Sequence, residues 1–153
     1  MNKIFLSLLL LSLSGCAVLI PPAYNPGAVM SHFREGQASK DSFYVSYKGD
    51  RGSSPEQARD FVVLRGAELV MQNDFRYFKI PKMNQGTLVT SNYQIASGVR
   101  NDTYQPMVEA QIVGVKEPGA DTEVLDAIKV AKALRIKYRL NYKLTPLELK
   151  YSY

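Results

Sequence analysis

Hydrophobic and polar positions alternate with different periods along the chain, and each period predicts a different element. Between residues 42 and 48, aromatic and aliphatic side chains occupy every second position, which predicts a strand with one buried face. A helix is predicted next, because Ser54 stands where an N-cap residue is needed, Pro55 follows at the first helical position and Gln57 can close a capping box. We expect this helix to run to about Asn73.

The predicted helix carries an apolar stripe at helical spacing, and we expect this stripe to face the core. Its members are Val63, Leu64, Ala67, Val70 and Met71. Beside the stripe, Arg65, Glu68 and Gln72 lie one above another on the helix surface. These three side chains could form a polar recognition row, but we favour a solvent-exposed ion pair that keeps the helix soluble.

Shorter patterns predict further strands of the same sheet. Strands are expected at residues 75–80, 86–96 and 107–116, and Pro81 should end the first of them. The segment 97–102 between the last two strands predicts a loop, because it lacks the glycine spacing and the lysine of a phosphate-binding turn. Together these strands should form an antiparallel meander.

The C-terminal part of the chain predicts a helix and then a strand. Asp121-Thr122 offers an N-cap for a short amphipathic helix that ends near Ala131. From Arg135 to Leu144, polar and apolar residues alternate strictly, which is the clearest strand signal in the chain. The whole pattern predicts an α+β fold, a two-layer domain of order β-α-β-β-β-α-β with two helices on one face of an antiparallel sheet.

Composition limits the chemistry that this domain can perform. The chain has 153 residues, of which 46% are hydrophobic and 22% charged, as in an ordinary globular domain. One Cys excludes an internal disulfide, and one Cys with one His cannot supply a structural zinc site. His32 lies outside the predicted domain, and pairs such as Glu109 with Asp102 or Glu117 are not placed in a cleft by any pattern. We therefore expect no catalytic residues, no metal and no cofactor.

The N-terminus predicts a cleaved signal peptide at residues 1–15. Lys3 precedes an apolar run that is too short to span a bilayer, and two small residues follow it. The sequence Leu13-Ser14-Gly15-Cys16 resembles the lipobox of bacterial lipoproteins. This resemblance implies cleavage between Gly15 and Cys16, and a covalent diacylglycerol and N-acyl chain, such as palmitate, on Cys16 as the lipid anchor.

The residue after the modified Cys sorts lipoproteins between membranes in Gram-negative bacteria. Ala17 at this position implies the periplasmic face of the outer membrane, with the inner membrane and the cell surface as less favoured alternatives. Residues 16–40 contain several prolines and no sustained apolar period, so they predict a lipidated N-terminus and flexible tether. Residues 41–153 should form the single α+β domain.

Three short motifs resemble a family of uncharacterised proteobacterial outer-membrane lipoproteins. They are Tyr47-Lys48-Gly49, Leu64-Arg65-Gly66-Ala67-Glu68-Leu69 and Phe75-Arg76-Tyr77-Phe78. In that family a strand leads through an aromatic-x-Gly turn into a helix with a Leu-Arg-x-Ala-Glu motif, and an aromatic strand follows. Where the family pattern has Gly after the helix, this chain has Asn73-Asp74, which can adopt the same left-handed conformation. The family is uncharacterised and has no known activity to carry over, so the resemblance transfers no catalytic residue to this chain.

Basic residues are concentrated near the C-terminus. Residues 129–150 hold seven Lys or Arg against one Glu, a net charge of +6, whereas residues 16–128 have a net charge of −2. Four basic side chains would share the outer face of the predicted last strand: Arg135, Lys137, Arg139 and Lys143. They could bind anionic envelope components such as lipopolysaccharide, phospholipid or a cell-wall polymer. Alternatively, they only protect an exposed strand from edge-to-edge aggregation.

These features predict a non-catalytic cell-envelope lipoprotein that acts as a binding or assembly module. Its membrane contact would be the lipid on Cys16, and its partner an envelope protein rather than nucleic acid. The alternative is a binder of anionic glycolipid or other envelope components through the basic strand. An envelope hydrolase has the least support, because no catalytic constellation can be assembled.

Overall fold

One antiparallel sheet and three helices make up the fold. The computed structural model describes Tyr24, Pro26, residues 32–140 and residues 143–151. The strands are β1 (Phe33–Gln37), β2 (Ser42–Lys48), β3 (Tyr77–Gln94), β4 (Val99–Val115) and β5 (Leu125–Asp126). The helices are α1 (Pro55–Gln72), α2 (Ala127–Lys137) and α3 (Pro146–Lys150). The strand order in the sheet is β1-β2-β4-β3-β5.

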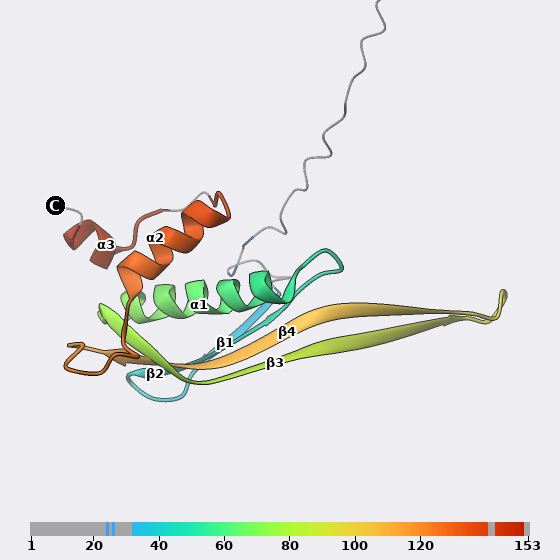
Figure 1. Cartoon of the computed structure of the whole chain (residues 1–153), viewed down its shortest axis with the longest axis horizontal. Helices are drawn as coiled ribbons and strands as arrows, with labels where there is room; N and C mark the ends of the chain where they lie inside the picture. Colours follow the sequence, from blue (N-terminus) through green and yellow to red (C-terminus); the bar gives the residue numbers. More distant parts are fainter. Residues whose placement is uncertain (1–23, 25, 27–31, 141–142, 152–153) are drawn as a thin grey trace, which may run out of the picture.

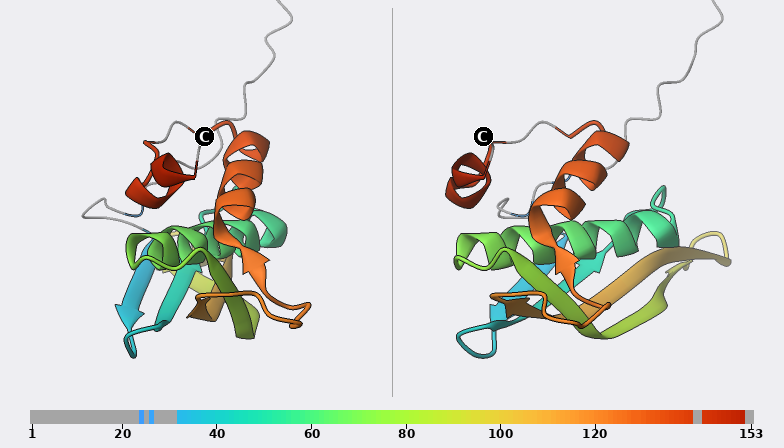
Figure 2. Two further views of the ribbon diagram at one scale, coloured as in Figure 1. Left: turned by 90° about the vertical axis from the view of Figure 1, so that its left-hand side faces the viewer. Right: turned by 60° about the vertical axis from the view of Figure 1, so that its left-hand side comes forward.

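All three helices lie on one face of the sheet (Figures 1 and 2). Helix α1 crosses the sheet and packs on β2 and β4, whereas α2 and α3 pack on α1. The predicted α+β class is therefore confirmed. The predicted element order is wrong in detail, since the observed order is β-β-α-β-β-β-α-α.

Helix α1 begins and packs as its sequence predicts. The Ser54 hydroxyl accepts a hydrogen bond from the Gln57 backbone N–H at 3.0 Å, and Pro55 follows the cap. The side chain of Leu64 is completely buried. At Gly66, a Cβ atom would lie 2.7 Å from Ile112 Cδ1, so only glycine lets the helix approach β4 this closely.

The end of α1 also follows the prediction. Asn73 is the C-cap, and Asp74 after it has a φ of 61°, the left-handed conformation usually taken by glycine. The core lies between α1 and the sheet, and its largest fully buried side chains are Tyr47, Phe61, Phe78, Leu64, Met71, Ile112, Val45, Val62, Val70 and Val108.

Strand β1 lies in a segment that we expected to be part of the flexible tether. It pairs antiparallel with β2 from Phe33↔Tyr47 to Gln37↔Phe43 and forms one edge of the sheet. Phe33 is its one buried residue, which is why the sequence shows no alternating pattern there. Tyr24 also packs on the domain, with its ring centroid 5.3 Å from that of Phe33. The folded unit therefore includes residues before position 41.

Strands β3 and β4 are much longer than predicted. Pro81 does not end β3, because the pairing register shifts between Lys79 and Lys82 and the strand continues beyond this irregularity. Residues 99–102, which we expected in a loop, belong to β4. The two strands thus form one hairpin that extends beyond the rest of the sheet (Figure 1).

The predicted strand from Arg135 to Leu144 is wrong. Its first part lies in α2, which extends to Lys137 and whose N-cap is Asp126 rather than Asp121 or Thr122. The Asp126 carboxylate accepts hydrogen bonds from the backbone N–H groups of Ile128 and Lys129. The helix buries Ala127, Ala131 and Arg135. Because arginine is polar, the sequence pattern does not show these three positions as one buried helical face.

Candidate functional site

The predicted lipidation site cannot be located in the structure. Cys16 and Gly15, together with the rest of the signal peptide, lie outside the described residues. Among the described residues, no helix is both long enough and apolar enough to cross a bilayer. The anchor therefore stays a prediction from the sequence.

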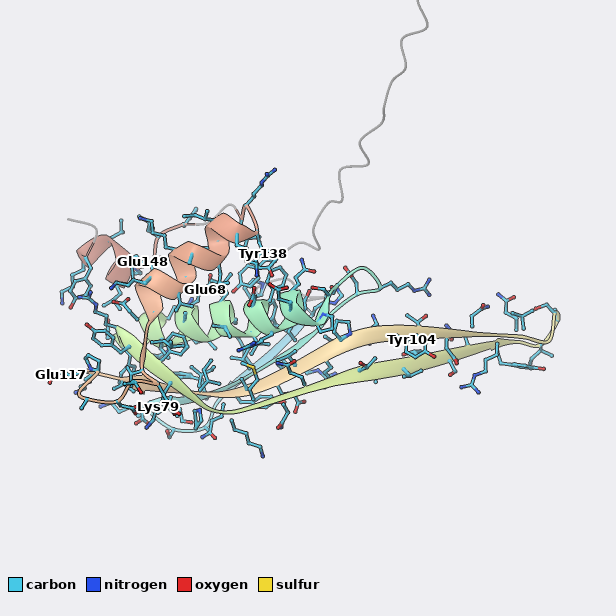
Figure 3. All side chains as sticks on the ribbon, viewed as in Figure 1. Glu68, Lys79, Tyr104, Glu117, Tyr138 and Glu148 are labelled. Carbon is cyan, nitrogen blue, oxygen red and sulfur yellow. The ribbon has the colours of Figure 1, made fainter. Side chains whose placement is uncertain are left out.

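The four basic residues proposed to bind anions do not form one strand face. Arg135 is 3% exposed, and its guanidinium pairs with Glu68 and Glu148, the two glutamates that Figure 3 labels beside the helices. The ammonium group of Lys137 pairs with Glu56 and Asp60 of α1.

The other two basic residues, Arg139 and Lys143, do not lie in a strand. Arg139 follows the end of α2 with a φ of 51°, and Lys143 is exposed in the segment before α3. The geometry on which the anion-binding interpretation depended is therefore absent from this part of the structure.

Glu68 is the centre of a buried network of charged side chains. Its carboxylate accepts hydrogen bonds from the Tyr24 hydroxyl at 2.7 Å, Arg65 Nη1 at 3.2 Å and Arg135 Nη2 at 2.9 Å. Arg65 also donates to Glu35 of β1. The network joins α1 to the residues before β1, to β1 itself and to α2.

The ionisation of the network follows from burial and pairing. Burial, with the charge and hydrogen bond of Glu68, raises the pKa of Tyr24 well above its usual value. Burial opposes the charge of Arg135, but the hydrogen bond and charge of Glu68, together with Glu148, hold the Arg135 pKa above its ordinary value. Tyrosine therefore stays neutral and arginine charged, as in a structural cluster rather than an acid–base pair.

The ion pair predicted within α1 is present, but its exposure was predicted wrongly. Arg65 and Glu68 pair at 3.2 Å, and each side chain is only 11% exposed. Gln72, the third member of the predicted row, is exposed. Arg65, Glu68 and Gln72 therefore do not form one exposed recognition surface, because Glu68 points into the contact between α1 and α2.

The other titratable residues noted in the sequence are dispersed. His32 Nδ1 lies 2.7 Å from the Lys48 carbonyl oxygen. Asp102 and Glu109 are an odd number of residues apart on β4, so they point to opposite faces, about 24 Å apart along the strand. Glu117 follows the end of β4. The described residues contain no cluster of three or more His, Cys, Asp or Glu that could hold a metal.

Two hollows lie beside the helices of the domain. One of about 230 Å³ is lined by Glu68, Arg135 and Thr145, among others. The other, of about 530 Å³, is largely apolar and lies between α1, α2 and β3, with Ile80, Met83 and Leu134 in its wall. In the first hollow, the buried charges of Glu68 and Arg135 are paired with each other, and the remaining charged residue of its wall, Lys143, is exposed.

A different feature stands out from the domain, namely the outer part of the β3–β4 hairpin. We call residues 88–105 the arm. β2 pairs with β4 only as far as Met107, and β5 pairs with β3 only at Tyr77 and Phe78. The arm therefore consists of two strands alone, paired from Leu88↔Gln105 to Gln94↔Val99, and it extends past the N-terminal end of α1 (Figures 1 and 3).

Large apolar side chains of the arm are open to solvent. Val89 and Tyr104 lie directly opposite each other and are 48% and 62% exposed. Tyr93 on the same side of the arm is 65% exposed, and Ile95 at the turn is 89% exposed. This side continues the face of β4 that packs under α1 in the domain, because every second residue of a strand shares a face. Nothing in the described chain covers it here.

The arm carries little charge. Its charged residues are Arg100 and Asp102, which pair at 2.9 Å, and Arg100 also donates to Ser91 at 3.0 Å. Hydrogen bonds from Ser91 and Arg100 lower the pKa of Asp102. Every other residue of the arm is uncharged, and Ser, Thr, Asn, Gln and Tyr predominate. Exposed tyrosines among small polar residues are the composition of adaptable protein-binding surfaces.

The local sequence pattern does not predict the arm. The segments 86–96 and 107–116 were expected as strands, but the pattern does not say that they pair far beyond the sheet. The exposure of Tyr93 is the one part that the sequence could suggest, because the predicted strand 86–96 is mostly polar, has only a weakly apolar face and contains no charged residue.

Comparisons with known proteins identify no relative. No family model matches the chain, and neither a curated protein nor a solved structure is significantly similar to it. The functional argument therefore depends on the chain itself.

Proposed function

We propose that this chain is a non-catalytic cell-envelope lipoprotein that acts as a binding or assembly module. Cys16 would carry the lipid anchor, on the periplasmic face of the outer membrane, as its lipobox-like context implies. The arm would make contact with an envelope protein. The anchor supplies location, and the arm supplies the contact.

The single observation that carries this proposal is the uncovered arm. A two-stranded ribbon is at best marginally stable by itself, and large apolar side chains that stay exposed give a free arm little of the stability that burial would provide. Six residue steps from Leu88 to Gln94 extend it by about 20 Å. The length of the arm and its exposed surface of polar and aromatic side chains both support a role in contacting another molecule.

Photo-crosslinking in intact cells tests the contact. A photoreactive aromatic residue would replace Tyr93 or Tyr104, and Tyr44 on the helix-free face of the sheet, 40% exposed, is the matched control. We expect the two arm positions to give discrete adducts containing another envelope protein, and Tyr44 to give none. Equal labelling at Tyr44, or no adduct at either arm position, would contradict the proposal.

A second test concerns the anchor. The Cys16→Ser chain should accumulate as an unprocessed precursor that incorporates no labelled fatty acid. Fatty-acid incorporation by this variant at the level of the parent chain would show that the anchor is not on Cys16.

A further inference from the structure

The outer edge of β3 is unusually open for the edge of a sheet. Beyond Phe78 no described strand pairs with this edge, so the backbone groups on the outer side of β3 are unpaired up to Gln94. From Met83 to Gln94 the strand contains no charged residue and no proline, and its register irregularity lies earlier, between Lys79 and Lys82. Proteins normally protect such edges with charges, prolines or bulges.

The neighbouring edge of the arm is protected in the usual way. Strand β4 has Pro106 at the base of the arm and the charged residues Arg100 and Asp102 along it. The two edges of one ribbon thus differ, and only the β3 edge suits the addition of another strand. Pairing through the β3 edge would therefore stop at two partners, because the β4 edge of each arm resists the addition of a further strand.

We infer that the β3 edge pairs with the same edge of a second copy of this chain, so that two arms form one four-stranded antiparallel sheet. This inference deepens the proposed function, since it makes one partner of the arm another copy of the protein. A strand that pairs antiparallel with its own copy is related to it by a two-fold axis, so each side chain meets a side chain on the same face. The uncharged residues of β3 bring no like charges together when the strand meets itself, and Arg100 of β4, which donates to Ser91, is neutralised by its ion pair with Asp102.

The side chains select a register for this pairing. With the two-fold axis at Ser91, Val89 of each copy lies opposite Tyr93 of the other, which gives two aromatic–β-branched pairs. An axis at Thr90 would place Val89 opposite Ser91 instead, and an axis at Val89 would place Tyr93 opposite Gln85. The Ser91 register therefore covers the most exposed apolar surface, since Val89 and Tyr93 are 48% and 65% exposed.

Cysteine crosslinking of the full-length chain tests this register. Ser91→Cys would place two thiols directly opposite each other at the axis, within the reach of a disulfide. Thr103→Cys is the control, because it lies in β4, one strand further from the axis on each side. Under mild oxidation we expect Ser91→Cys to give a covalent dimer, and Thr103→Cys and the parent chain, which retains Cys16, to give none. Equal dimer yields at positions 91 and 103 would overturn the inference.

Light scattering tests the pairing without any crosslink. Ser91→Lys would place two ammonium groups against each other at the axis, whereas Thr103→Lys adds the same charge to the other strand. We expect the parent and Thr103→Lys chains to be dimers and the Ser91→Lys chain to be a monomer. The inference would also be overturned if the parent chain were monomeric at the highest concentration measured and the Ser91→Cys chain gave no covalent dimer.

Failure of this inference and failure of the proposed function give different results. Adducts of Tyr93 or Tyr104 with another envelope protein, without a Ser91→Cys dimer, would refute self-pairing and leave the proposed function standing. A Ser91→Cys dimer in a chain whose arm contacts no other protein in cells would establish self-pairing and refute the proposed contact of the arm with an envelope protein.

Discussion

The inner and outer parts of the β3–β4 hairpin have the same backbone pairing and opposite surroundings. In the inner part, Phe78, Val108 and Ile112 are fully buried or nearly so, because α1 covers that face. In the outer part, the equivalent face carries Val89 and Tyr93 in solvent, together with Tyr104, which is labelled in Figure 3. Strand pairing alone therefore does not make a hydrophobic core. The core extends along the hairpin only as far as the 18-residue helix α1 covers it.

The comparison also separates two kinds of charged contact. In the domain, Arg135 and Glu68 are buried and connect elements that are far apart in sequence. In the arm, Arg100 and Asp102 are neighbours on one strand, and the Arg100 side chain is 65% exposed. Removing a charge should therefore be costly in the first place and nearly neutral in the second.

The largest effect is expected from Glu68→Ala. This change leaves the buried guanidinium of Arg135 with only one of its two carboxylate partners, and we expect the free energy of unfolding to fall by about 3–5 kcal/mol. Chemical denaturation of the purified chain measures this loss. Glu56→Ala is the matched control, because Glu56 also lies on α1 and pairs with a basic residue of α2, but its side chain is 72% exposed.

A combined replacement distinguishes burial of charge from simple loss of packing at the same site. Glu68→Met, Arg135→Met and Glu148→Gln together remove the buried charges, since Arg135 pairs with both carboxylates. We expect this triple variant to recover much of the stability that Glu68→Ala loses. If Glu56→Ala were as damaging as Glu68→Ala, the distinction between buried and exposed pairs would not hold for this fold.

The next largest effect contrasts two glycines of the same hairpin. At Gly114, a Cβ would lie 2.6 Å from the ring of Phe75, so Gly114→Ala should cost about 1–3 kcal/mol by overpacking. At Gly86, near the base of the arm, a Cβ would meet nothing within 4 Å. Gly86→Ala should stabilise the protein by about 0.4–1 kcal/mol, because alanine restricts the unfolded chain. Thermal unfolding of the two variants checks the opposite signs, and a loss at Gly86 would show that the base of the arm is more crowded.

Local signals in the sequence were sufficient for the first helix and the strand before it. Ser54, Pro55 and Gln57 act within one turn, and Phe43, Val45 and Tyr47 alternate within one strand, so each pattern is complete in a few residues. The class of the fold followed from these elements and from the antiparallel strands after them.

Features that depend on distant partners could not be predicted in the same way. Arg135 occupies a buried position of α2 because Glu68, 67 residues earlier, neutralises it. Without that partner, the alternation from Arg135 to Leu144 favours a strand, since arginine counts as polar in any local pattern. Similarly, β1 has one buried residue and forms because β2 offers an edge to pair with. The arm was missed because its length depends on where other strands stop.

A smaller effect is expected from removing the arm itself. Replacing residues 89–104 with Asn-Gly would join Leu88 and Gln105, which face each other, through a two-residue turn. Since the arm packs on nothing in the described domain, we expect the free energy of unfolding to change by less than about 1 kcal/mol. The envelope protein captured by crosslinking through the arm should nevertheless no longer co-purify with the shortened chain from cells. Loss of the folded domain would show instead that the arm is part of its stability.

The smallest effect is expected from Arg100→Ala in the arm. Its ion pair with Asp102 joins two exposed side chains two residues apart, and water screens their attraction. We expect the midpoint of thermal unfolding to be unchanged within error, at low salt and at high salt alike. The same variant should keep the Ser91→Cys dimer, because Arg100 lies on β4 and contacts Ser91 through its side chain, so its loss leaves the backbone groups of the β3 edge unchanged. A fall in the midpoint comparable to that of Glu68→Ala would mean that the arm and the domain unfold as one unit, and the contrast between them would then concern exposure alone.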